Sequence, residues 1–261
     1  MACSGEPEAE KSNEVAKSFG KLDPNALAQA VSKAELVPSP VEMQEKLAKL
    51  GLQSELGSMV TTSSDIAVVV PNDNDQTAIR IGVVMADLVL TVKKSDKETI
   101  LGRLGKLKKG LNQLGAGGDI SSTIEDFEAR VQKAEIKKSE LLTEFDEMAG
   151  VMVPELEYEA GDWVVPLIQA GTWLEGANLV SKLMIKEGKY DGADEFFRQK
   201  EVVEYFISYV NREGKDRTTE GIADKLVDTL KRLKDIASQP KLTEADVKEI
   251  EKLTSSVLAL L

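Results

Sequence analysis

Two long segments of this chain are apolar on nearly every side, and they constrain the fold more than any other feature. One covers residues 76–93 (QTAIRIGVVMADLVLTVK) and the other covers residues 163–186, with Pro166 near its start. A helix that is apolar all round is stable only when other helices surround it. The sequence therefore predicts two central helices that pack on each other.

The remaining segments predict amphipathic helices separated by turns. Ser95-Asp96-Lys97-Glu98 is a helix-start signal, and apolar residues then recur at helical spacing from Ile100 to Leu114. A capping-box pattern opens the last helix at Thr243. We expect an all-α fold: a single multi-helix bundle of about nine to eleven helices over residues 21–261. Residues 1–20 are charged and weakly hydrophobic, which is typical of a solvated N-terminal linker.

Three local features lead to sharper expectations. Ser121 is expected to cap one helix that continues to Met148 with a bend near residues 136–138, and Pro154 is expected to break the chain's helical course. The stretch between residues 52 and 74 is irregular. Its Asn-Asp-Asn-Asp cluster at residues 72–75 lacks the glycine and glutamate of a calcium loop, so a helix N-cap at Asn74 or Asp75 is favoured.

Composition excludes several classes of chemistry. The 261-residue chain has no histidine and one cysteine, so it has no intramolecular disulfide, no histidine base and no Cys-His or Ser-His-Asp site. No cofactor or metal site is expected. The net charge of −12 argues against binding nucleic acid. Any enzymatic role would have to rest on carboxylates, and we expect no enzyme.

The single cysteine is Cys3, preceded by alanine and followed by a polar run. This arrangement resembles the processed start of a bacterial lipoprotein, in which the thiol carries lipid. The resemblance implies a periplasmic protein, anchored through N-terminal acylation to the inner leaflet of the outer membrane. An unmodified cysteine at a frayed terminus is the alternative.

Three further motifs carry a second resemblance. They are Gly82-x-x-x-Ala86-Asp87-Leu88, a leucine-striped helix that ends in Leu114-Gly115, and Gly171-x-Trp173-Leu174-Glu175-Gly176. Over about Ala78 to Tyr209 they resemble a group of uncharacterised all-helical lipoproteins of Gram-negative bacteria. A narrower resemblance is to the outer-membrane lipoprotein of a bacterial sterol transport system, which implies a lipid-handling role.

Asp87 and Glu175 are the two carboxylates inside the apolar segments. In the structural interpretation each carboxylate pairs with an arginine or accepts hydrogen bonds from a helix N-terminus. Arg80, two turns before Asp87, is the expected partner of Asp87. The functional interpretation makes one of them a polar anchor in an apolar pocket. Asn178 is at i+3 from Glu175, so the two side chains are expected to form one polar point.

A hydrophobic ligand would need a lining of adaptable and aromatic side chains, although each such residue is more often plain core. The predicted ligand-binding residues are Met85, Asp87, Leu88, Phe145, Met148, Met152, Leu167, Trp173, Leu174, Glu175, Asn178, Tyr205, Phe206 and Tyr209.

Three functions remain open. The first is non-covalent binding of a lipid, such as a sterol, for transport, with other transport components as partners. The second is a structural or protein-interaction lipoprotein that has a solid helical core and acts through its acidic surface or a helical groove. The third, favoured least, is a carboxylate-based hydrolase.

Overall fold

The structure is a computed structural model that describes residues 40–261, apart from 53–55, 57–58, 60, 117, 162–163 and 212–221. The described residues all belong to one compact unit, Val37–Leu261. They form ten α-helices and no strand, which confirms the all-α prediction. The expected linker at residues 1–20, with Cys3, lies outside the described residues.

The elements are numbered along the chain. In chain order they are α3 (Pro40–Lys49), the 3-10 turn η2 (Thr62–Ser64), α4 (Asn74–Thr91), α5 (Lys97–Gln113), α6 (Gly118–Gln132), α7 (Lys138–Ala160), α8 (Val164–Glu187), α9 (Ala193–Phe197), α10 (Lys200–Tyr209), α11 (Ile222–Ala237) and α12 (Glu244–Leu258). The segments predicted to be central helices are α4 and α8, and α8 begins just before Pro166, where a proline is tolerated.

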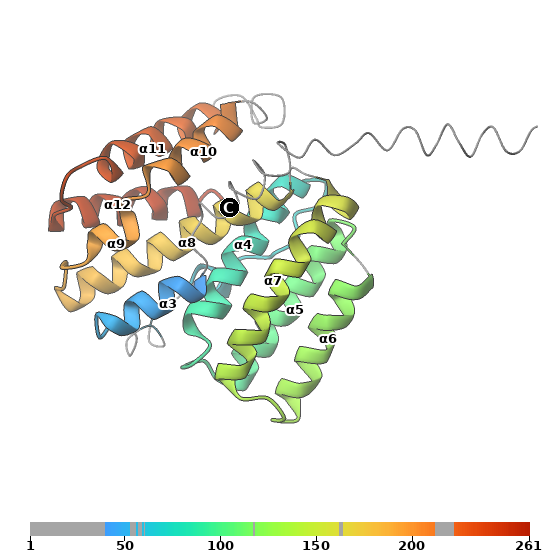
Figure 1. Cartoon of the computed structure of the whole chain (residues 1–261). Coiled ribbons are helices and arrows are strands. Elements are labelled where there is room, and N and C mark those ends of the chain that lie inside the picture. The colour runs from blue at the N-terminus through green and yellow to red at the C-terminus, as the bar shows by residue number, and fades with distance from the viewer. Residues whose placement is uncertain are drawn as a thin grey trace, which may run out of the picture. The chain divides into compact units, whose positions relative to one another are not determined.

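Helices α4 and α8 pack directly on each other in the middle of the unit (Figure 1). Their backbones approach closely where each has a glycine. A Cβ at Gly82 would lie 2.0 Å from the carbonyl oxygen of Ile168, and a Cβ at Gly171 would lie 2.0 Å from that of Ile79. Thr172 Oγ1 also donates to the carbonyl of Gly82 at 3.2 Å. Two glycines therefore allow this contact, which no other residue type permits.

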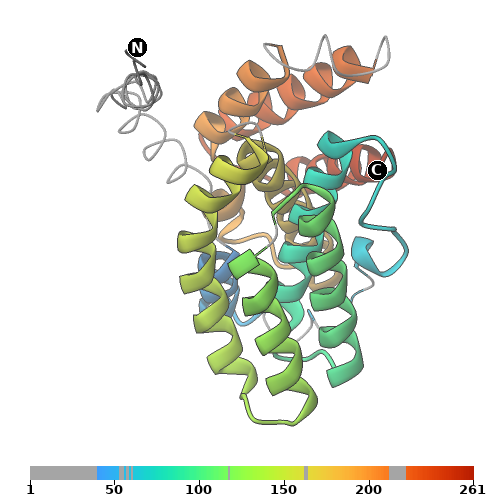
Figure 2. The ribbon, with the colours of Figure 1, turned by 90° about the vertical axis from the view of Figure 1, so that its right-hand side faces the viewer.

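Two hydrophobic clusters lie on either side of this contact. The first joins α4 to α5, α6 and α7, and the second joins α8 to α3 and α9–α12. Helices α5, α6 and α7 run alongside one another in both views (Figures 1 and 2). The central helices contribute to both clusters: Val83 and Leu90 of α4 belong to the second, and Val164 and Ile168 of α8 belong to the first.

Several predicted boundaries are confirmed. Asp96 caps α5 by accepting from Thr99 N at 2.7 Å, and Thr243 forms the predicted capping box with Asp246. One cap is displaced: the N-cap of α4 is Asp73, which accepts from Gln76 N at 2.8 Å, so the prediction of Asn74 or Asp75 was wrong by one or two residues.

Two predictions about the following region are wrong. Ser121 lies inside α6, and the helix expected to continue to Met148 is two helices, because the chain reverses at residues 133–137 with Ala134 at a φ of 57°. Pro154 does not break the chain, since α7 continues to Ala160. A proline inside a helix removes one backbone hydrogen bond and disfavours the helix, but it does not end α7. The helix instead ends at Gly161, whose φ is 102°.

None of the helices in the described part of the chain is both long enough and apolar enough to cross a bilayer.

Candidate functional site

The two carboxylates of the central helices meet at the α4–α8 contact. Asp87 and Glu175 are both 0 % exposed, and the Asp87 carboxyl lies close enough to raise the pKa of the Glu175 carboxyl. Neither carboxylate faces solvent. Two buried carboxylates in contact cannot both carry a charge without a large cost, so the pair favours one shared proton.

The irregular segment at residues 61–67, here named the strap, covers this pair. Glu175 Oε1 accepts from Thr62 N at 3.1 Å, and Glu175 Oε2 accepts from Thr62 Oγ1 at 2.7 Å. Asp87 Oδ2 accepts from Ser63 N at 2.8 Å. Each carboxylate therefore binds the backbone of one strap residue, and together they hold two successive N–H groups.

Cations from α5 and α4 bind the other atoms of the strap. Arg103 Nη2 donates to Thr61 Oγ1 at 3.0 Å. Lys106 Nζ donates to the carbonyl of Ser63 and, at 3.1 Å, to that of Ile66. Arg80 of α4 donates to the carbonyl of Ala67 at 2.6 Å. The strap thus lies in a polar cradle in which carboxylates bind its N–H groups and cations bind its oxygens.

Arg103 also connects the cradle to the central helix. It is 7 % exposed, and its Nη1 donates to Thr91 Oγ1, to the carbonyl of Asp87 at 3.2 Å and to Ser95 Oγ at 3.2 Å. Burial lowers the pKa of Arg103, and the nearby carboxylates of Asp87, Glu175 and Asp96 act in the opposite direction. A guanidinium is the cation that best satisfies several acceptors in such a place.

Burial raises the pKa of the Glu175 carboxyl from its ordinary value of 4.5 to about 8. The neighbouring Asp87 adds to this rise, whereas the two bonds from Thr62 oppose it. Asp87 Oδ1 is buried and receives no bond from any N–H or hydroxyl group of the described residues. Near neutral pH the Glu175 carboxyl therefore keeps its proton.

Two expected partnerships differ from those found. Arg80 binds the strap at Ala67, and the guanidinium near Asp87 is that of Arg103, one helix away. Asn178 is fully buried like Glu175, but its Nδ2 donates to Thr254 Oγ1 at 3.0 Å and to Ser255 Oγ at 2.7 Å on α12. Glu175 and Asn178 therefore face different elements, and the single polar point predicted for them was wrong.

The predicted ligand-binding residues are not brought together around one space. Met85, Leu88, Phe145, Leu167 and Tyr209 belong to or pack against the first cluster, whereas Trp173, Leu174, Tyr205 and Phe206 belong to or pack against the second. Nothing is described of the side chains of Met148 and Met152. Within the described residues the predicted lining is mostly plain core.

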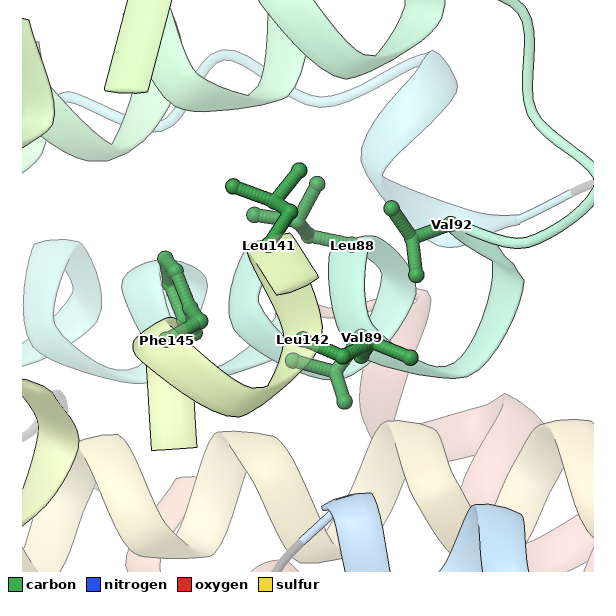
Figure 3. A pocket seen from close by; sticks show the side chains of 6 residues that line it. All are labelled: Leu88, Val89, Val92, Leu141, Leu142 and Phe145. Atoms are coloured by element: carbon green, nitrogen blue, oxygen red, sulfur yellow. The ribbon is translucent and has the colours of Figure 1, made fainter. Parts of the chain in front are cut away.

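An apolar hollow lies between α4 and α7, and Figure 3 shows the side chains that line it. Its lining is Leu88 and Val89 from α4, Val92 directly after α4, and Leu141, Leu142 and Phe145 from α7. Only Leu88 and Phe145 were predicted. The hollow has no room for a water molecule, so as it stands it holds no ligand.

A surface of a different kind lies on α6, α7 and their connection, here named the acidic hairpin. Residues 118–160 contain 12 acidic and 4 basic residues, a net charge of −8 against −12 for the whole chain. Some of these acids have partners: Glu144 binds Arg130 at 2.6 Å and Glu128 binds Lys108 at 2.6 Å. Tyr158 is 86 % exposed on α7, between the exposed Glu157 and Glu159.

Sequence reasoning missed the cradle's cations and the strap, although one signal was available. Arg103 lies three residues after Ile100, on the same buried stripe as Leu104 and Leu107, and a charge on such a stripe indicates a buried partner. Backbone N–H groups give no such signal, so the role of Thr62 and Ser63 was not predictable from their identities.

With the strap closed, the cradle holds a proton and a peptide backbone. A general acid or nucleophile needs access to a substrate, and both carboxylates are covered. Within the described residues, no group of three acidic, cysteine or histidine side chains is placed to hold a metal ion.

None of the protein-family models, curated proteins or solved structures compared with this chain matches it.

Proposed function

We propose that the protein is a non-enzymatic interaction module that binds a positively charged partner protein on its acidic hairpin. The observation that carries the proposal is Tyr158, 86 % exposed in the most acidic part of the chain. Large exposed aromatic side chains are rare on free surfaces and are enriched at the centres of protein interfaces.

The packing of the central helices supports a solid core. Gly82 and Gly171 bring the backbones of α4 and α8 into contact, and the interior of that contact is filled by the hydrogen-bonded carboxylates and Arg103. A ligand cavity between the two helices would require separating them. This observation favours the interaction role over a carrier that opens between α4 and α8.

The chemistry of the surface indicates an arginine-rich partner. A field of excess carboxylates attracts a cationic surface and accelerates its association. An arginine can also stack on the exposed ring of Tyr158 while it pairs with Glu159. Lysine would supply the charge without the planar stacking.

A photoreactive amino acid placed at position 158 in the natural host tests this proposal. We expect one dominant adduct of defined mass, which weakens when Glu157 and Glu159 are both replaced by lysine. The matched control places the same amino acid at Lys241, an exposed position outside the acidic hairpin. Equal adducts at both positions, or adducts that survive the charge reversal, would contradict the proposal.

The hollow between α4 and α7 favours a second candidate, the binding of a hydrophobic ligand. All six lining residues are apolar, and α7 belongs to a hairpin, so an outward movement of α7 would open an apolar groove over α4. The ligand would be a lipid chain, and its burial would contribute about 25 cal/mol per Å² of apolar area. This role agrees with the sterol-transport resemblance, which stays a prediction.

Native mass spectrometry after incubation with a lipid extract distinguishes the two candidates. Retained lipid that is lost in Leu142→Trp, a variant that fills the hollow, would support the carrier. Tyr158→Ala is the matched control and should retain as much lipid as the wild type. If no lipid of any class is retained, the carrier is rejected and the interaction module is the remaining candidate.

Acylation of Cys3 and the outer-membrane location stay predictions, since this residue lies outside the described part. Labelling the natural host with a radioactive fatty acid tests them. The label should enter the wild type and be absent from Cys3→Ser. An unlabelled wild-type protein would contradict the prediction that Cys3 is acylated.

A further inference from the structure

The strap is held by an unusual set of contacts for a surface segment. Its two central N–H groups, those of Thr62 and Ser63, bind carboxylates that belong to two different buried helices. Loop N–H groups ordinarily bind other backbone groups, side chains of the same loop or water. Here the attachment of a loop depends directly on a buried ionisable pair.

The exposure of the strap shows that it is a cover. Ser64, Asp65 and Ala67 are exposed, whereas Thr61 and Ser63 are 3 % and 2 % exposed on the inner side. The hydroxyl of Ser63 is buried without a hydrogen-bond partner in the described residues, and so is Asp87 Oδ1. The closed state is therefore less stable than it would be if both of these atoms had hydrogen-bond partners.

We propose that the strap is a proton-controlled latch: it is closed while Asp87 and Glu175 share a proton, and it opens when that proton is lost. The opening step is a deprotonation followed by hydration of the contacts between the strap and the carboxylates. Glu175 releases its proton to solvent, the two carboxylates repel each other, and water replaces the bonds to Thr62 and Ser63. This inference does not depend on the proposed function, because the latch and the acidic hairpin are different surfaces.

The charged groups that act on the pair or bind the strap come from α4, α5 and α8. Helix α4 supplies Asp87 and Arg80, α5 supplies Arg103 and Lys106, and α8 supplies Glu175. Asp96, the N-cap of α5, acts on Arg103. On the strap itself the titratable residue is Asp65, which is exposed. The guanidinium of Arg103 is bonded to main-chain and hydroxyl oxygens, so the charge of a second carboxylate is not fully compensated.

The direction of the pH effect follows from the raised pKa of Glu175. In the closed state the carboxyl keeps its proton up to about pH 8, whereas an open, hydrated carboxyl releases it at lower pH. Opening is therefore accompanied by proton release and becomes more favourable as the pH rises. Above about pH 8 the closed state is ionised as well, and the dependence levels off.

Hydrogen exchange of the strap amides tests the latch in the intact chain. Protection factors, which are corrected for the intrinsic pH dependence of exchange, should fall by about tenfold or more between about pH 6 and about pH 9. Glu175→Gln should remove this fall, because glutamine stays neutral and still accepts from Thr62. Asp87→Asn should move the fall to lower pH, because it removes the neighbouring charge.

Glu147→Gln is the matched control, because Glu147 is exposed on α7 and distant in sequence from the cradle. It should behave as the wild type. If Glu175→Gln does not fold, Thr62→Val provides a second variant: it removes one bond to Glu175 and should lower strap protection even at about pH 6. A wild-type strap whose protection is independent of pH overturns the latch, and so does an unchanged fall in a folded Glu175→Gln.

Discussion

At the scale of the residue, Arg103 decides whether the buried carboxyl pair can exist. Removing a carboxylate from water costs several kcal/mol unless opposite charge and hydrogen bonds replace the water. Arg103 supplies the opposite charge, and its guanidinium is held by Thr91, Ser95, Thr61 and the main-chain carbonyl of Asp87. The hydrogen bonds to the carboxylates themselves come from Thr62 and Ser63. The stability of the centre should therefore be very sensitive to this one side chain.

We expect Arg103→Met to lower the free energy of unfolding by about 3 kcal/mol, because it leaves buried acceptors and a buried carboxylate unpaired. Urea denaturation measures the change. Lys109→Met on the same helix is the control, since Lys109 is exposed, and it should shift stability by less than about 0.5 kcal/mol. Equal effects of the two substitutions would show that the guanidinium has no special role.

The sequence allowed both acids of the pair to be found, but not their surroundings. Asp87 and Glu175 were recognisable because a carboxylate inside an apolar helix is exceptional. Their contact depends on how α4 and α8 cross, and the crossing depends on Gly82 and Gly171, whose effect is evident only once the helices are paired. The strap could not be predicted, because it is bound largely through backbone groups.

At the scale of the element, the crossing of α4 and α8 has the strictest steric requirement in the described structure. A methyl group at Gly171 would overlap the carbonyl of Ile79, a backbone atom that cannot rotate away. The helices would have to separate, and the bonds at the carboxyl pair would stretch with them.

Gly171→Ala should therefore lower the free energy of unfolding by about 3 kcal/mol, as severe overpacking does. Gly102→Ala on α5 is the matched control, because a Cβ there meets no atom within 4 Å and its φ is not positive. It should raise stability by about 0.5 kcal/mol through helix propensity. Differential scanning calorimetry or urea denaturation separates the two, and a tolerated Gly171→Ala would contradict the close approach.

The start of α12 offers a prediction about a helix end. Thr243 accepts from Asp246 N, and Asp246 in turn accepts from Thr243 N at 2.8 Å. Thr243→Ala should cost about 1 kcal/mol in thermal or chemical denaturation. Ser256→Ala, near the other end of the same helix and exposed, should have little effect. A cost for Ser256→Ala as large as that for Thr243→Ala would refute the capping interpretation.

Some elements were predicted well because their signals are local. The stripe of α5 and the caps at Asp96 and Thr243 require only neighbouring residues. The separation of α6 from α7 was missed, because Ala134 adopts a positive φ with no glycine to indicate a turn. At Pro154 the sequence predicted a break that does not occur, since α7 continues through this proline to Ala160.

At the scale of the whole molecule, α4 and α8 connect the two hydrophobic clusters through residues that each helix contributes to both. The carboxyl pair lies on the contact between these two helices. A change in its protonation therefore acts on the stability of the complete unit as well as on the strap.

We expect the free energy of unfolding to fall as the pH rises from about 5 to about 8 and to level off above that range. The pKa of Glu175 is about 8 in the folded protein and near its ordinary value of 4.5 in the unfolded chain. The folded state thus binds more protons within this window, and the stabilisation present below about pH 4.5 is lost through about pH 8.

Hydrogen bonds lower the pKa of other carboxyls, such as those of Glu140 and Glu144. These carboxyls stop stabilising the folded state only at more acidic pH, so they do not change the free energy of unfolding between about pH 5 and about pH 8. Urea denaturation as a function of pH measures the effect. Glu175→Gln should give a nearly flat profile between about pH 5 and about pH 8, with Glu147→Gln as the unchanged control. A flat wild-type profile would show that Glu175 titrates normally.

The glycine contact has a consequence for recognising distant relatives. Gly82 precedes Asp87 by five positions, and Gly171 precedes Glu175 by four. On each helix, the glycine that allows the backbones to approach therefore lies within five residues of the acid that belongs to the carboxyl pair. Most other core positions can exchange one aliphatic residue for another during evolution. Descendants of a common ancestor should therefore be recognisable by this four-residue signature long after the rest of their sequences have diverged.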